Sequence, residues 1–235
     1  GAAALVLIVV GYAAWVRGPP SGWRERLAIA RRRMTHGPAP AIGAASLVAF
    51  AAIGGWIYYN TNVLNEYVDT TEAQRRRADY ETTYRRHADE PQPKITAVRV
   101  DVDLWPREQR LRMRGRYTIA NRGDRPVRTL QLNFASGATQ IVHAIELGVP
   151  ARLAVDDRRL GVRRYELERP LAPGESSTLD VDLELPTRGF TNEGSNTAVV
   201  YNGSFVNGRL LLPGFGYDAH AELERDQDRR KFGLQ

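Results

Sequence analysis

The residues from Val98 to Leu104 read VRVDVDL, and those from Leu179 to Leu185 read LDVDLEL. Apolar and charged residues alternate at every position in both stretches. This period of two places all four apolar side chains of each stretch on one face of an extended strand. A charge introduced on that face, at Val100 or at Val181, is therefore expected to unfold the domain, whereas Arg99 and Asp180 are expected to face water.

The same alternation recurs in the neighbouring sequence, and residues typical of turns separate the repeats. It continues through residues 111–119 and 130–134, with turn signals at Asn121–Asp124 and Pro173–Gly174. Short alternating strands joined by turns predict an antiparallel β-domain over residues 94–235, built as a sheet or sandwich with one wet face. About 140 residues suffice for a hydrophobic core of ordinary size.

Two uncharged runs precede this β-domain. Residues 1–16 read GAAALVLIVVGYAAWV, and residues 41–59 read AIGAASLVAFAAIGGWIYY with three aromatic residues at the end. Since a bilayer span takes about 20 apolar residues, residues 41–60 are predicted to be a transmembrane helix and residues 1–16 a transmembrane helix truncated at its start. A signal peptide is the alternative for the first run, and a buried core helix for the second.

Between the two runs, residues 17–40 carry six arginines against the single acid Glu25. An excess of basic residues in a short loop marks the cytoplasmic side of a membrane. Residues 17–40 are thus predicted to be a basic cytoplasmic loop, and everything after Asn60 to lie outside. The alternative, a nucleic-acid patch, lacks a base-stacking module, so we expect the lipid bilayer and no nucleic acid as a partner.

Residues 61–93 are predicted to form a charged juxtamembrane helix that lifts the β-domain off the membrane. Glutamate and arginine follow each other at the favourable spacing of four residues in Glu72–Arg76 and Glu81–Arg85. Pro91 and Pro93 then end the helical segment, because proline removes a backbone donor and disfavours helix in the residue before it.

Nothing in the sequence predicts a catalytic, cofactor-binding or metal-binding residue. The chain has no cysteine, and none of its four histidines (His36, His87, His143 and His220) has another histidine at metal-ligand spacing. The carboxylate pairs Asp156–Asp157 and Asp180/Asp182 are explained by the surface alternation of strands. The chain by itself is therefore expected not to be an enzyme and to bind no zinc.

Three stretches carry a resemblance to a known family. Residues 56–134 (WIYYNTNVLNEYV … TLQLNF), 169–186 (RPLAPGESSTLDVDLELP) and 202–218 (NGSFVNGRLLLPGFGYD) resemble bacterial inner-membrane proteins that join an ABC-transporter-permease-like membrane region to an extracytoplasmic domain of the aminopeptidase N (gluzincin) family. The β-domain is similar to the saddle-like N-terminal domain of that family. The resemblance covers residues 41–235.

The resemblance implies a zinc metallopeptidase context without a peptidase in this chain. The family's H-E-x-x-H zinc motif and its G-x-M-E-N strand are both absent from the sequence. If the resemblance holds, zinc is expected in a catalytic domain beyond this chain, with Leu210–Phe215 packed against it. A final strand followed by a frayed tail is the alternative for that end.

Two functions stay open at this point. In the first, the chain is the membrane anchor and N-terminal β-domain of a larger zinc-aminopeptidase-like protein of the bacterial inner membrane, with its C-terminal domain extracytoplasmic. In the second, it is a tethered extracytoplasmic binding or scaffolding module of a transporter, in contact with transporter subunits and without peptidase activity. The presence or absence of the zinc motif in the continuing reading frame discriminates the two.

The topology is tested by labelling from the two sides of sealed vesicles. Because the chain has no cysteine, a Cys introduced at Ser21 and a Cys introduced at Ser136 report separately on the basic loop and on the β-domain. We expect the two to react with a membrane-impermeant maleimide from opposite sides. Reaction of both from one side would end the two-span topology.

Overall fold

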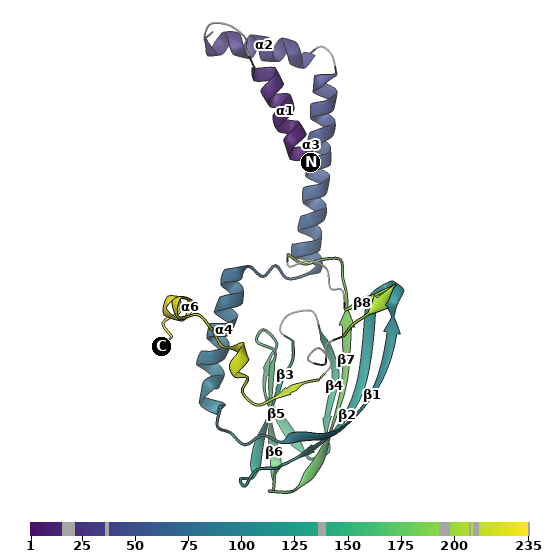
Figure 1. Ribbon diagram of the computed structural model, residues 1–235, viewed down its shortest axis with the longest axis vertical. Helices are drawn as coiled ribbons and strands as arrows, with labels where there is room; N and C mark the ends of the chain where they lie inside the picture. The colour runs from purple at the N-terminus through teal and green to yellow at the C-terminus, as the bar shows by residue number, and fades with distance from the viewer. Residues whose placement is uncertain are drawn as a thin grey trace. The chain divides into compact units, whose positions relative to one another are not determined.

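The computed structural model describes residues 1–15, 22–35, 38–135, 140–192, 198–206, 208 and 212–234 (Figure 1). The chain divides into two compact units, Gly1–Val63 and Leu64–Gln235. Ser21, His36, Ser136, Leu210 and Leu211, which the sequence singled out, lie outside the described residues.

The first unit is helical. It contains α1 (Ala2–Ala14), α2 (Trp23–Thr35) and α3 (Ala39–Tyr58), which continues as the π-helical turn η1 (Tyr59–Leu64). Helix α1 packs along α3, and the Val9 side chain lies so close to Gly43 that a Cβ atom there would be 3.1 Å from Val9 Cγ1. Small residues at such crossings allow apolar helices to pack without a polar interface.

One helix in the described part of the chain is long and apolar enough to cross a membrane, by length and composition. It is the 26-residue stretch Ala39–Leu64, and only 6% of its apolar window is buried in the protein. It contains the predicted span at residues 41–60, while the 13-residue α1 is shorter than a span. Within the predicted basic loop, residues Trp23–Thr35 form the helix α2; Ala, Leu, Met and Arg all favour helix.

The second unit confirms the antiparallel β-domain. Sheet A has the strand order β1 (Lys94–Trp105), β2 (Arg110–Ala120), β7 (Ser176–Pro186), β4 (Ile141–Leu147). Sheet B has the order β10 (Gly214–Phe215), β3 (Val127–Asn133), β6 (Val162–Leu171), β5 (Ala151–Asp157). All of these pairings are antiparallel, as is the small hairpin of β8 (Val199–Val200) and β9 (Gly203–Ser204).

Both sheets contribute to one hydrophobic core. The inward residues of β2 and β7 are at most 3% exposed, and they pack with Leu130 and Leu132 of β3; they are Leu111, Met113, Tyr117, Ile119, Leu179, Val181, Leu183 and Leu185. Gly115 lies among them because a Cβ atom there would come within 2.6 Å of the Tyr117 hydroxyl. The core thus follows the alternation read from Leu179 to Leu185.

Strand β1 departs from the prediction. Val98, Val100, Val102 and Leu104 share a face with the core residues of β2, with which they pair, yet they are 38–46% exposed. Strand β1 is an edge strand of sheet A, and the shared core is built from β2, β7 and β3. The expectation that a charge at Val100 unfolds the domain is therefore corrected, since that residue is 38% exposed whereas Val181 is 3% exposed.

Helix α4 (Thr70–Tyr84) belongs to the β-domain unit rather than standing apart as a spacer. Its N-terminus is capped by the Asp69 side chain, which accepts a hydrogen bond of 2.7 Å from the Glu72 N–H. Tyr80 and Tyr84 pack on Val162 of β6. After α4 the chain forms the short 3₁₀ turn η2 (Arg85–His87) before the prolines.

The C-terminal segment also docks on the domain. Strand β10 pairs with β3, and Tyr217 then stacks on Tyr80 with a centroid distance of 5.3 Å. The chain continues through the 3₁₀ turn η4 (Ala219–Ala221) into helix α6 (Asp226–Lys231). The described residues 212–234 therefore form a packed segment instead of a frayed tail.

Substitutions at Val100 and at Val181 are now expected to have different effects on stability. We expect Val181→Asp to unfold the domain, because it adds the cost of a buried charge to the loss of about 1.5–3 kcal/mol of apolar burial. Val100→Asp, Arg99→Ala and Asp180→Ala should each change the free energy of unfolding by less than about 1 kcal/mol. Urea unfolding followed by circular dichroism measures this, and equal losses at Val100 and Val181 would contradict the fold.

Candidate functional site

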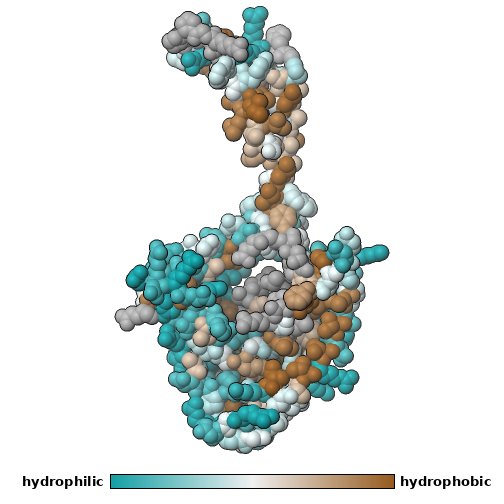
Figure 2. All heavy atoms as spheres, in the orientation of Figure 1, coloured by the Kyte–Doolittle hydropathy of each residue, from teal (hydrophilic) through white to brown (hydrophobic). Residues whose placement is uncertain are grey.

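The candidate site is a row of apolar side chains on the inward face of the edge strand β1. We call this row, Val98, Val100, Val102 and Leu104, the open β1 face. Its exposed fractions are 45%, 38%, 42% and 46%. In Figure 2 hydrophobic colour runs over the surface that β1 forms. Contiguous apolar surface of this kind marks a site of interaction, since it gains free energy when another surface covers it.

More apolar surface lies near the end of β1. The β8–β9 hairpin contacts η3 (Pro106–Glu108), the 3₁₀ turn that follows β1. Tyr201 and Phe205 of this hairpin are 81% and 83% exposed. Large aromatic side chains are the residues that anchor protein interfaces most often.

The opposite face of sheet A is a ladder of ion pairs. Arg112 donates two hydrogen bonds to Asp182, of 2.9 and 2.7 Å, and Arg116 Nε donates one of 2.6 Å to Asp180. The hydrogen bonds from Arg112 hold the pKa of Asp182 below its usual range. Asp180 and Asp182 therefore act as separate partners of two arginines, and neither forms the carboxylate pair that acid–base catalysis uses.

A groove of about 470 Å³ runs over this ladder. Its lining combines basic and acidic side chains, among them Arg99, Arg114, Asp101 and Glu146. A cleft lined by one sign of charge would focus a field on a ligand, whereas mixed signs cancel it. The groove is therefore part of the ion-pair surface, and its charges do not favour a ligand of one sign.

Two of the histidines singled out in the sequence have side-chain partners. His87 Nδ1 lies 2.6 Å from Glu90 Oε1, and His143 Nε2 lies 2.7 Å from Glu184 Oε2. His220 is exposed in η4. Within the described ranges no group of three or more His, Asp or Glu side chains could hold a metal ion. These residues do not fit a zinc site, which needs three or four converging ligands.

Asp156 and Asp157 are the last two residues of β5, and they have different hydrogen-bond partners. Asp156 accepts hydrogen bonds from Arg158 and Arg163, which lower its pKa against the opposing effect of burial. Asp157 accepts one bond of 3.0 Å from the Tyr84 hydroxyl and another of 3.0 Å from the Leu160 N–H. Asp157 therefore ties the turn to α4.

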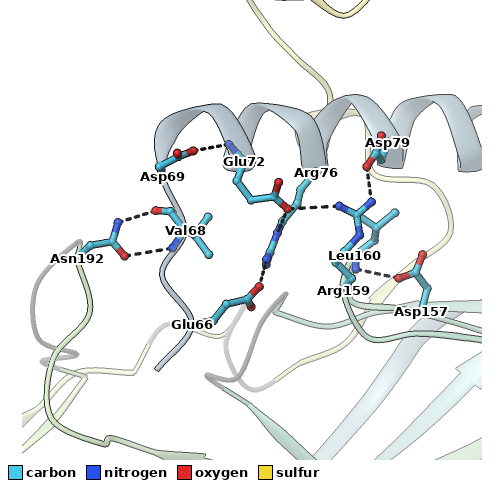
Figure 3. Close-up of polar contacts among 10 residues, drawn as sticks. All are labelled: Glu66, Val68, Asp69, Glu72, Arg76, Asp79, Asp157, Arg159, Leu160 and Asn192. Atoms are coloured by element: carbon cyan, nitrogen blue, oxygen red, sulfur yellow. Dashed lines mark hydrogen bonds and ion pairs between the residues drawn. The ribbon is translucent and has the colours of Figure 1, made fainter. Parts of the chain in front are cut away.

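Figure 3 shows how the segment before and within α4 is held on the domain. Arg159, from the β5–β6 turn, pairs with Asp79 and reaches Glu72 at 3.5 Å. Arg76 joins Glu72 to Glu66. The Asn192 side chain hydrogen-bonds both the N–H and the C=O of Val68, as a second strand would. Segments far apart in the sequence are thus fixed to one another.

A buried ion pair joins α4 to the C-terminal segment. The Glu81 side chain is 3% exposed and accepts hydrogen bonds of 2.9 and 2.6 Å from Arg229 and one of 2.6 Å from Arg85. Burial opposes the charged form of Glu81, but these hydrogen bonds prevail and lower its pKa. The sequence indicated the Glu81–Arg85 spacing, but it carried no signal for Arg229, 148 residues away.

Comparisons with known proteins give a partial likeness. No protein-family model matches the chain, and no curated protein is similar to it. Among solved structures, an M1 zinc metallopeptidase from Deinococcus radiodurans is 17% identical, with 43% of this chain and 22% of that chain covered and a TM-score of 0.33. A mutant from the same organism bound to a Tyr-Ser-Ala substrate is 19% identical, with coverages of 41% and 21% and a TM-score of 0.33.

A two-domain M1 zinc metallopeptidase mutant bound to L-tryptophan gives the same figures, 19% identity, coverages of 41% and 21%, and a TM-score of 0.33. The matched region therefore spans about a fifth of those chains. The metallopeptidase activity belongs to those enzymes, and a match of this extent does not assign it to this chain. None of the comparisons bears on the permease-like membrane region, which stays a prediction.

The Glu81–Arg229 pair predicts a pH-dependent stability. Since the pKa of folded Glu81 lies below its ordinary value of 4.5, its stabilisation is complete above that value and is lost as the pH falls through the folded pKa. Glu81→Gln should cost about 2 kcal/mol at neutral pH, and less in acid. Urea unfolding at pH values from neutral to acid measures the difference.

The matched control is Glu168→Gln, the same chemical change at an exposed position of β6. It should leave the free energy of unfolding within about 0.5 kcal/mol of the unaltered chain. A cost of Glu81→Gln that stays constant into acid would show that the pair does not act through the charge of Glu81.

Proposed function

We propose that this chain is the membrane-anchored, non-catalytic β-domain of a larger protein of zinc-aminopeptidase type, and that the open β1 face is where it holds the catalytic domain. The resemblance of residues 41–235 to the aminopeptidase N family, whose N-terminal domain is saddle-like, supports the kind of partner. The helix Ala39–Leu64, apolar and long enough for a span, supports the anchor.

The observation that carries the proposal is the open β1 face itself. Four apolar side chains, about two-fifths exposed, lie side by side next to the buried inward residues of β2 and β7. Covering a large apolar side chain contributes about 1.5–3 kcal/mol when burial becomes complete. The row therefore supplies the apolar centre of an interface, and the charged outer face of sheet A can stay in solvent.

Leu210–Phe215 remains a second proposed contact with the catalytic domain. In the described part of this stretch Pro213 is buried, and Phe215 is half-buried against the core of the domain. Strand β10 is already paired with β3. These residues would thus contribute an edge to the interface, while the open β1 face would contribute its centre.

Zinc, in this proposal, is held by residues outside this chain and supplies the Lewis acid for peptide hydrolysis. The residues of this chain bind and position the domain that holds it. The alternative role, a scaffolding module of a transporter in the inner membrane, uses the same tether and the same open face with a different partner.

Charges on the open face test the proposal in the complete protein. We expect Val100→Asp and Val102→Asp to lower chelator-sensitive hydrolysis of an aminoacyl reporter at least tenfold, because a charge at the centre of an interface costs about 1.4 kcal/mol or more. Arg99→Asp, on the outward face of the same strand, is the control and should leave hydrolysis unchanged. Unchanged hydrolysis in Val100→Asp refutes the interface, and no hydrolysis in the unaltered protein favours the scaffold.

The second contact is tested by amide hydrogen exchange over Leu210–Tyr217. Protection should be stronger in the complete protein than in this chain alone, since a covering domain slows local opening. Exchange of residues 98–104 reports on the open face in the same experiment. Equal protection of Leu210–Tyr217 in both samples would remove this stretch from the interface.

A further inference from the structure

Helix α2 carries a narrow apolar stripe bordered by arginines. Trp23, Leu27, Ala30 and Met34 follow one another at spacings of four, three and four residues, which line one face of a helix. Trp23 is 68% exposed, Leu27 59% and Met34 37%. An exposed tryptophan–leucine–methionine stripe on a helix of 13 residues gains free energy only when something apolar covers it.

Arginines border the stripe on both sides. Arg24 and Arg31, each directly after a residue of the stripe in the sequence, lie along one side of it. Arg26 and Arg33, each directly before a residue of the stripe, lie along the other side. Arg24, Arg26 and Arg31 are exposed and form no ion pair with any residue in the described part of the chain. The Arg24 guanidinium lies 5.4 Å from the centroid of the Trp23 ring. Long basic side chains beside an apolar stripe reach outward from it with their charged ends.

Arg33, in contrast, makes hydrogen bonds that attach α2 to the end of α1. Its Nη1 donates hydrogen bonds to the backbone oxygens of Tyr12 and Trp15, at the C-terminal end of α1. Those carbonyls have no partner within α1, so the arginine satisfies them. Figure 1 shows α2 lying across the ends of α1 and α3. Tyr12 and Trp15, both exposed, stand at the same end, where aromatic residues mark a membrane boundary.

We propose that α2 lies flat in the interface of an anionic lipid leaflet, with Trp23, Leu27 and Met34 in the acyl boundary and Arg24, Arg26 and Arg31 on lipid phosphates. This rests on the proposed membrane anchor. Five arginines against one glutamate on α2 make the surface complementary to phosphate. A stripe this narrow, between cationic borders, is typical of helices that lie on a membrane rather than cross it.

The test reads the depth of two positions in the full chain in lipid vesicles. The chain has no cysteine, so a bimane fluorophore can be placed on Leu27→Cys and, as the matched control on the opposite face, on Glu25→Cys. We expect brominated acyl chains to quench the fluorophore at Leu27→Cys, and iodide in the water to quench the one at Glu25→Cys. Equal iodide quenching at both positions overturns the proposal.

Headgroup preference is read at Leu27→Cys with brominated phosphatidylglycerol or brominated phosphatidylcholine at the same mole fraction. The anionic lipid should quench at least twofold more strongly, since one arginine near the surface enriches it about fivefold. Arg24→Gln with Arg31→Gln should bring the ratio towards one. Arg75→Gln with Arg77→Gln, the same change at two exposed arginines of α4, should leave it unchanged.

The remaining outcomes are also decisive. A fluorophore at Leu27→Cys that neither quencher reaches means that protein covers the stripe, which overturns the lipid assignment. A ratio of one in the unaltered helix does the same. Alkaline carbonate extraction separates this proposal from the anchor: release of the chain from membranes overturns the anchor, whereas a retained chain with a water-exposed Leu27→Cys overturns only the placement of α2.

Discussion

The register between β2 and β7 is the constraint on which the β-domain depends. Gly115 lies opposite Val181 and Met113 opposite Leu183, so the inward side chains of two central strands meet in one core. The same register sets Arg116 opposite Asp180, which makes the outward ladder. A slip by one residue would exchange the faces, burying the charges and exposing the core. One alignment of two strands therefore decides both surfaces of sheet A.

Segments from the two ends of the domain pack on sheet B. Helix α4 and the C-terminal segment pack on it through Tyr80, Tyr84 and Tyr217 and are joined by the buried Glu81–Arg229 pair. A buried pair that loses one partner leaves an uncompensated charge, so the two segments depend on each other. The domain thus uses its own ends to cover sheet B, while the apolar row of β1 stays partly exposed.

The two units divide the proposed work. The β-domain contributes surface: a charged outer face for solvent and an apolar row for a neighbouring domain. The helical unit contributes attachment, through an apolar helix of 26 residues and a basic helix that lies across its end. In the described structure His87, His143, Asp180 and Asp182 each have a side-chain partner. The proposed role of the chain is to position and to anchor.

The sequence by itself determined the strands with strict alternation, the apolar helix at residues 41–60 and the helical segment before the prolines, because these depend on local period and composition. It did not resolve β4, β5 and β6, whose alternation is interrupted by small and charged residues. The alternation also predicts one buried apolar face for both VRVDVDL in β1 and LDVDLEL in β7, and so it does not distinguish the two strands. Only the tertiary structure decided that β7 is central and buried while β1 is an edge with its apolar row exposed, since burial depends on which strand another layer covers. The Glu81–Arg229 pair depends likewise on a contact between residues 148 positions apart, which no local pattern encodes.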